Sequence, residues 1–226
     1  MTPLKLMMRS VLYAHLIDEL KEPEKELFST SERNIASYIR SSLEIFKNID
    51  MPLSQYQVDT EYNRVGLKNS SKRMDKARVV PDIIVHKRGK TVKEHKEANY
   101  LCIEIKKIKR FNGDVEAITI MEKRKRLEAD LDKLTFFRRS KNFRYKYGVS
   151  IVISDPHTIY FKISDEDFTR CSIKKIPISK QKRFIEIVER AVVITREHGF
   201  VDKVSFQAKV KRYEKEIDQI VTSCLA

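Results

Sequence analysis

Two short apolar runs carry acidic and basic side chains in positions that suit phosphodiester chemistry. A proline precedes Asp82, which opens the run 82–86, and Glu104 and Lys106 lie within the alternating run 100–106. Proline is tolerated at the start of a strand but not in its middle, so Asp82 is predicted to stand where a strand begins. Each charged group would then project from a β-sheet rather than from a loop.

The second run alternates in a way that separates its charged side chains from its apolar ones. Successive side chains of a strand point to opposite faces, so Glu104 and Lys106 share one face with Cys102. The other face holds Leu101, Ile103 and Ile105. If the two runs pair as neighbouring strands, Asp82 and Glu104 bring carboxylate oxygens together, which is what a hard divalent cation such as Mg²⁺ requires. Lys106 could then orient an attacking water or stabilise charge on a phosphate, because its ammonium is a compact three-proton donor.

This arrangement resembles the PD-(D/E)xK phosphodiesterase superfamily, the restriction-endonuclease-like nucleases. The resemblance rests on Pro81-Asp82, a gap of 21 residues, and Glu104-Ile105-Lys106. Glu-x-Lys alone is a common pattern, which also occurs at 19–21 and at 94–96. Only Glu104 to Lys106 lies in an apolar strand with a Pro-Asp strand upstream, so this occurrence carries the comparison.

The resemblance implies a metal-dependent endonuclease that hydrolyses phosphodiester bonds with Mg²⁺, for which Mn²⁺ can substitute. It implies Asp82, Glu104 and the backbone carbonyl of Ile105 as metal ligands. It also implies that Lys106 positions the attacking water.

Two further acids fit the family pattern, and each has a structural alternative. The resemblance implies Glu61, on the expected first strand, as a further catalytic and metal-binding acid, but Glu61 can instead pair with Arg64. Glu32, on the expected first helix, would be an additional metal ligand. The run Ser29-Thr-Ser-Glu32 also has capping-box spacing, so Glu32 can instead cap that helix. Asp82 can likewise be only a turn acid, and Glu104 with Lys106 only a surface ion pair worth under about 1 kcal/mol, but their joint order and context favour a site.

The family's order of elements, helix, three antiparallel strands, helix, strand, can be laid over residues 31–153. Apolar residues at helical spacing from Ile35 to Phe46 predict the first helix. Strands are predicted at 56–62, 82–86, 100–106 and 147–153. A helix before the last strand is predicted from the stripe Ile120, Leu127, Leu131 and Leu134, and the polar residues 87–99 suit an extended hairpin tip. The expected fold class is therefore α/β, a mixed central β-sheet flanked by helices, with a restriction-endonuclease-like αβββαβ core.

Further elements extend this core. A helix is predicted at 4–20, and a strand at 158–163 is expected to form a hairpin with the last core strand. Two helices close the chain, near 179–197 and 203–224. The last helix has apolar residues at heptad-like spacing, which suits either a homodimer seam or packing on its own domain, with packing preferred. These residues are Phe206, Val210, Tyr213, Ile217, Ile220 and Cys224. One domain is expected over 1–226, with the core at about 29–163, the N-terminal helix 4–20 and a C-terminal helical extension 178–224.

The charge of the chain points to a polyanionic partner. Its 226 residues contain 46 Lys and Arg against 32 Asp and Glu, a formal net charge of +14. Such a charge favours nucleic acid or an anionic membrane surface. DNA is preferred over RNA because most of the resembled family acts on DNA. The segment 67–78 is basic and lacks apolar periodicity, so it is expected as a surface loop, either solvated or touching phosphates through Lys72, Arg73, Lys76 and Arg78.

Other features bound the class of protein. Three widely spaced cysteines indicate neither a disulfide framework nor a metal site, which fits a reducing cytoplasm. The N-terminal segment is too short and too charged to span a bilayer, so no membrane association is expected. Two functional alternatives stay open. One is a nucleic-acid-binding or assembly protein that keeps the nuclease fold without turnover, and the other is a toxin or defence effector nuclease controlled by a regulatory partner protein.

Overall fold

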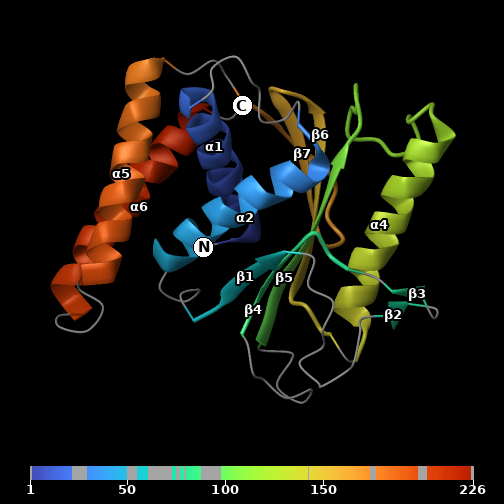
Figure 1. Ribbon diagram of the computed structural model, residues 1–226, viewed down its shortest axis with the longest axis horizontal. Coiled ribbons are helices and arrows are strands. Elements are labelled where there is room, and N and C mark those ends of the chain that lie inside the picture. The colour runs from blue at the N-terminus through green and yellow to red at the C-terminus, as the bar shows by residue number, and fades with distance from the viewer. Residues whose placement is uncertain are drawn as a thin grey trace.

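The computed structural model describes residues 2–21, 30–49, 55–60, 73–74, 77–78, 80–87, 98–141, 143–173, 177–197 and 203–224. It is an α/β fold in which a six-stranded mixed sheet has helices on both faces (Figure 1). The described helices are α1 (Pro3–Lys21), α2 (Glu32–Ile49), α4 (Met121–Arg139), α5 (Ile178–Glu197) and α6 (Lys203–Cys224). The sheet, in spatial order, consists of β1 (Gln57–Thr60), β4 (Ile83–His86), β5 (Asn99–Lys107), β6 (Tyr147–Asp155), β7 (Thr158–Ile163) and β8 (Thr169–Ser172).

Strand direction follows from the connections between the strands. All neighbouring strands are antiparallel except β5 and β6, which are parallel. Parallel neighbours need a crossover connection, and α4 lies between them in the chain. The predicted hairpin of β6 and β7 is confirmed. The edge strand β8 was not predicted, because only Cys171 of its four residues is buried and so no alternation is visible.

Different helices cover the two faces of the sheet. In Figure 1, α4 lies on one side of the strands, whereas α1, α2, α5 and α6 lie on the other. Ile103 and Ile105 of β5 belong to the large core on the four-helix side, whereas Cys102 packs with Leu134 and Phe137 of α4. The predicted separation of two faces in β5 is therefore confirmed.

The terminal helices belong to the same core. α1 is buried on most of its surface because it contacts α2, α5, α6 and β7, so Leu6 and Met7, outside any single stripe, are also buried. In α6, Val210, Ile217 and Val221 are buried against this core, so this face packs within the chain. A homodimer through 203–224 stays a prediction. None of the described helices has the length and apolar character needed to cross a membrane.

Two local expectations were wrong. Within the expected loop 67–78, the short strands β2 (Arg73–Met74) and β3 (Ala77–Arg78) pair antiparallel, and strands of two residues are too short to show periodicity. In α4, the residue Ile120 precedes the helix and is 53% exposed rather than buried. The buried residues of α4 are Leu127, Asp130, Leu134 and Phe137.

The helix α4 approaches β6 closely at Gly148. A Cβ atom on this residue would lie 3.2 Å from Leu134 Cβ and 3.2 Å from Arg138 Cδ. Contacts this short are tighter than ordinary van der Waals packing, so the absence of a side chain lets the helix lie against the strand. Any side chain that α4 directs toward the sheet is thereby brought close to β5 and β6.

Candidate active site

The strand register brings Asp82 and Glu104 together. Ile83 pairs with Ile103 and Ile84 with Cys102 in the antiparallel β4–β5 ladder. One further step of this register sets Asp82 opposite Glu104. The backbone N–H of Ile105 donates to Asp82 Oδ2 at 2.7 Å, which fixes the carboxylate at the start of β4. The predicted neighbourhood of the two acids is therefore confirmed.

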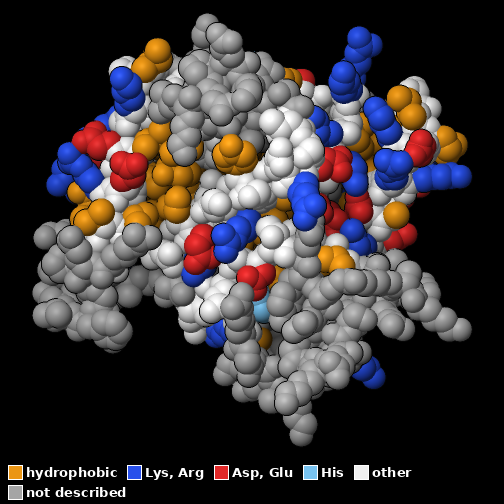
Figure 2. Space-filling view, in the orientation of Figure 1, with side chains coloured by type: hydrophobic (Ala, Val, Ile, Leu, Met, Phe, Trp, Pro, Cys, Tyr) orange, Lys and Arg blue, Asp and Glu red, His pale blue; other side chains and the backbone are white. Residues whose placement is uncertain are grey.

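Two side chains from α4 complete the charged cluster. Lys106 Nζ lies 2.9 Å from Asp130 Oδ2, and Lys133 Nζ lies 2.7 Å from Glu104 Oε2 and 3.2 Å from Asp130 Oδ1. These pairs form one chain of alternating charge between β5 and α4. Figure 2 shows acidic and basic side chains gathered next to one another beside α4.

Glu104 is the most enclosed member of this cluster. Its residue is 3% exposed, and its Oε1 atom is buried without a hydrogen-bond partner among the described residues. Burial, and then the charge of Asp82, raise the pKa of Glu104 well above its usual range, while Lys133 opposes the rise. A buried carboxylate oxygen without a partner is unfavourable, so a cation or a hydrogen-bond donor beside it would be stabilising.

The other charged groups respond to the same surroundings. Burial raises the pKa of Asp82, although the N–H of Ile105 and the charge of Lys133 act in the other direction. Burial alone would lower the pKa of Lys106, but its hydrogen bond to Asp130 and that group's charge outweigh burial, so this pKa is raised. At Lys133, burial would also lower the pKa, but the interactions with Glu104 and then with Asp130 outweigh it. The pKa of Lys133 is therefore raised. Both ammonium groups therefore stay charged at neutral pH.

Glu32 reaches the site from the first turn of α2. Its Oε1 accepts a hydrogen bond from the backbone N–H of Lys107 at 2.8 Å, and its Oε2 lies 3.6 Å from Lys106 Nζ. The residue that caps α2 is Ser31, whose Oγ accepts the N–H of Asn34 at 3.2 Å. The capping-box interpretation of Glu32 is therefore wrong, because the helix begins too late for it. The alternative, a carboxylate directed at the site, agrees with the structure.

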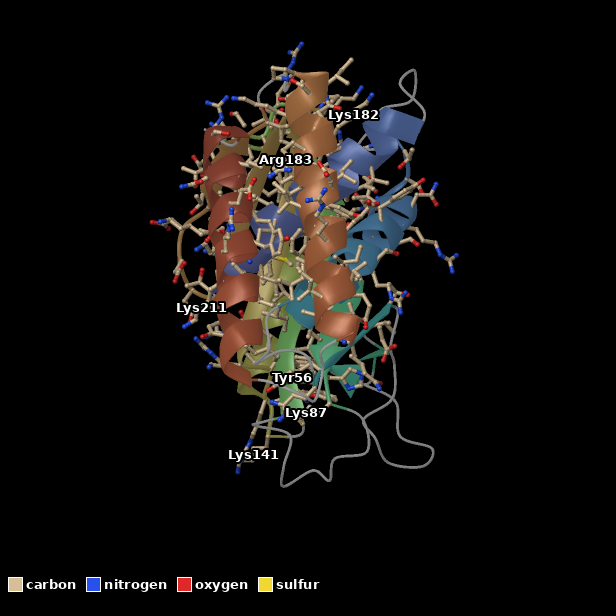
Figure 3. All side chains as sticks on the ribbon, turned by 90° about the vertical axis from the view of Figure 1, so that its left-hand side faces the viewer. Tyr56, Lys87, Lys141, Lys182, Arg183 and Lys211 are labelled. Atoms are coloured by element: carbon tan, nitrogen blue, oxygen red, sulfur yellow. The ribbon has the colours of Figure 1, made fainter. Side chains whose placement is uncertain are left out.

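The remaining predicted site residues are placed only in part. Glu61, Lys72 and Lys76 lie outside the described residues. Arg73 of β2 and Arg78 of β3 are paired in the strand register, and their side chains are not described. Basic side chains that are described include Lys87, which lies over the Tyr56 ring, and Lys141; Figure 3 shows all three residues at the same end of the molecule. The acid described on β1, Asp59, is bound to His86 at 2.8 Å and is not part of the lysine-linked cluster.

The donor set fits a divalent cation in part. Within the described ranges, no three His, Cys, Asp or Glu side chains stand close enough to form a complete metal cluster. Two acids converge, however, and the free oxygen of Glu104 has no partner from the described chain. The N–H of Ile105 points to Asp82, and in an extended strand the carbonyl of the same residue points to the same side. Asp82, Glu104 and the Ile105 carbonyl are thus compatible with the oxygen ligands that Mg²⁺ prefers.

Asp130 and Lys133 were not predicted as site residues. The spacing Leu127, Asp130, Leu134, Phe137 is that of a core-facing stripe, and Asp130 is the charged member of it. A carboxylate at a core-facing position of a helix needs a partner inside the protein. This signal could have identified Asp130, and Lys133 three residues later.

Comparison with protein-family models, with curated proteins and with solved structures gives no match to this chain. The functional argument therefore rests on the geometry of the site.

Proposed function

We propose that this protein is a Mg²⁺-dependent endonuclease that hydrolyses phosphodiester bonds of nucleic acid, with DNA preferred over RNA. The observation that carries this proposal is the convergence of Asp82, Glu104 and Lys106 on one face of two paired strands. The buried oxygen of Glu104 that has no hydrogen-bond partner among the described residues supports it, because such an atom is suited to a cation. The net charge of +14 supports a polyanionic substrate.

The arrangement of elements supports a restriction-endonuclease-like core. In chain order α2, β1, β4, β5, α4 and β6 give a helix, three antiparallel strands, a helix and a strand. The acids and Lys106 lie on the two inner antiparallel strands, as the resemblance in sequence implies. Fold similarity alone would not give a function, so the site residues carry the proposal.

The charged groups of the candidate site and the Ile105 carbonyl each have a role in the proposed reaction. Asp82, Glu104 and the Ile105 carbonyl would hold Mg²⁺ or Mn²⁺, with Glu32 close to the lysine. When bound, such an ion polarises a phosphoryl oxygen and lowers the pKa of coordinated water. Lys106 positions the attacking water, or stabilises charge on the phosphate, through its ammonium protons.

The α4 residues hold the reacting groups in place. Asp130 anchors the Lys106 ammonium at 2.9 Å, and Lys133 neutralises Glu104 at 2.7 Å. Both are positioning residues in this proposal, since each acts through a strand residue. A fixed lysine matters because a misplacement of about 1 Å can lower a rate about a hundredfold.

The test is cleavage of single- and double-stranded DNA and RNA by the purified protein with Mg²⁺, Mn²⁺ or chelator. Asp82→Ala and Lys106→Ala should each lower the rate by about a hundredfold or more. Exposed residues give matched controls, Asp167→Ala and Lys125→Ala, which should cleave like the unmodified protein. Cleavage activity that persists in chelator, or in either site variant, would contradict the proposed site.

Binding measurements separate the alternatives. Salt-sensitive binding of nucleic acid without cleavage by the unmodified protein would favour a binding or assembly protein that keeps the fold without turnover. Cleavage that begins only when a second protein is added would favour an effector nuclease under partner control.

A further inference from the structure

A cavity of about 200 Å³ lies between α4 and the end of β7. Its walls are formed by Leu131, Leu134, Thr135 and Arg138 of α4, and by Lys162, Ser164 and Asp165. On the helix, Asp130 and Lys133 lie to one side of the buried Leu134, whereas Thr135 and Arg138 lie to the other. The cavity is therefore on the opposite flank of α4 from the candidate active site.

The strand register separates the cavity from the strand acids. Glu104 of β5 pairs with Ser150 of β6, and Ser150 pairs with Lys162 of β7. Two strand spacings amount to about 10 Å. Lys133 of α4 covers Glu104, and none of the charged residues of the candidate active site lines the cavity, so a ligand there would not touch Glu104.

Two cationic side chains line this cavity. Arg138 Nη1 pairs with Asp165 Oδ1 at 2.9 Å, and the Asp165 side chain is 64% exposed whereas that of Arg138 is 21% exposed. An exposed carboxylate can turn away into water at little cost, which leaves the guanidinium for another anion. The Lys162 ammonium donates to the carbonyl of Glu166, and that bond uses one of its three protons.

Ser164 adds a hydroxyl group to the cavity. Its Oγ atom is buried and makes no hydrogen bond to any described residue. The backbone of Ser164 is left-handed, with φ of 57°, and its N–H donates to the Gly148 carbonyl at 2.7 Å. Such a conformation is uncommon for a residue with a side chain, and here β6 holds it in place. Ser164 thereby stands in the cavity wall, and its hydroxyl has no hydrogen-bond partner among the described residues.

We propose that this cavity binds a phosphate group. Arg138 presents a planar guanidinium, Lys162 an ammonium, and Ser164 and Thr135 hydroxyl donors, a set that matches several oxygens of one compact anion. The volume is below the roughly 300–1,000 Å³ of clefts for drug-sized ligands, so a phosphate or the phosphorylated end of a larger molecule fits better than a whole nucleotide. Free phosphate and the terminal phosphate of a nucleic acid share this chemistry.

The test is calorimetric titration of the full chain with inorganic phosphate, with ionic strength held constant by chloride. Lys162→Met and Ser164→Ala should each weaken binding, by about tenfold for the lysine. Lys182→Met is the matched control, because Lys182 is an exposed residue of α5 on the other face of the sheet (Figures 1 and 3). It should bind phosphate like the unmodified protein.

A variant that should bind phosphate more tightly, rather than more weakly, makes the test more discriminating. Asp165→Asn removes the carboxylate that competes for Arg138, so phosphate should bind more tightly, whereas Asp167→Asn, with the same change in charge at an exposed neighbour, should leave affinity unchanged. The proposal is overturned if millimolar phosphate does not bind, if Lys162→Met binds normally, or if Lys182→Met weakens binding equally. A 5′-phosphorylated trinucleotide that binds more tightly than phosphate and than its unphosphorylated form would identify a nucleic-acid end as the source. Equal binding of trinucleotide phosphate and free phosphate would identify the free anion.

Discussion

Replacing Lys133 by methionine should destabilise the protein by removing the cation that faces a buried carboxylate. Lys133 Nζ lies 2.7 Å from Glu104 Oε2, and the two side chains are 17% and 4% exposed. Removing one partner of a buried ion pair costs about 3–5 kcal/mol. Because the lysine end is partly solvated, we expect the lower end, about 3 kcal/mol at about pH 8. In a chain of this length such a loss lowers Tm by about 6–12 °C.

The loss should depend on pH with a definite sign. Burial and Asp82 raise the pKa of Glu104, and Lys133 opposes them, so Lys133→Met raises this pKa further. A carboxyl group whose pKa is higher in the folded state than in the unfolded state binds more protons when folded. Stability is then lost as pH rises from the unfolded pKa toward the folded pKa. The variant should therefore be weakest above neutral pH and approach the unmodified protein at about pH 4, near the unfolded pKa of the carboxyl.

Urea denaturation of the variant across this pH range measures the effect. Lys125→Met, at an exposed position of the same helix, is the matched control and should change stability little. The double variant Lys133→Met, Glu104→Gln should recover stability at high pH, because it no longer contains the buried charge. A loss that is the same at every pH, or a double variant no more stable than Lys133→Met, would refute the reasoning.

Asp130→Asn should lower kcat by about ten- to a hundredfold with little change in KM, because Lys106 loses the anion 2.9 Å from its ammonium; the exposed neighbour variant Asp132→Asn should leave both constants unchanged, and equal effects of the two variants would contradict the positioning role. Binding of Mn²⁺, followed by calorimetry, should weaken as pH falls, and should do so from a higher pH than for ordinary carboxylates, because metal ligands must be deprotonated and burial raises the pKa of both strand acids. An affinity that is constant across the acidic range would count against those ligands. Gly148→Ala should lower the free energy of unfolding by about 1–3 kcal/mol, because the new Cβ would meet two α4 side chains at 3.2 Å. An unchanged denaturation midpoint would show that α4 can move from β6 freely.

The sheet was largely predictable because its strands carry their signal locally. Alternation in 100–106 gave the two faces of β5, and the apolar run 147–153 gave β6, which is buried along nearly its whole length. The position of Asp82 beside Glu104 could also be predicted, since it needs only that two neighbouring runs pair. β8 could not be, because four mostly exposed residues owe their strand conformation to pairing with β7.

The helical contribution to the site was harder to predict, for a physical reason. A search for apolar periodicity assigns charged residues to the solvent side, and α4 is so rich in charge that its buried side is poorly marked. Asp130 is one of the buried residues of α4, whereas the predicted apolar stripe included its neighbour Leu131 and not Asp130. For Glu32, the serine-rich run before the helix allows two starting points, and the hydrogen bonds that Asn34 and Ile35 donate to Ser31 decide between them.

The charge of the cluster explains why protons or a cation are needed there. Three enclosed carboxylates, those of Asp82, Glu104 and Asp130, face the two ammonium groups of Lys106 and Lys133, so the enclosed part of the fully ionised cluster carries one surplus negative charge. The Glu32 carboxylate beside Lys106 adds a second, but its side chain is 41% exposed. Surplus charge among groups shielded from water is unfavourable. The raised pKa values of both strand acids are the response available to the chain alone, because each carboxyl then keeps its proton to a higher pH than usual. A divalent cation would remove the same surplus without protons, and it would also give a partner to Glu104 Oε1, which has none among the described residues.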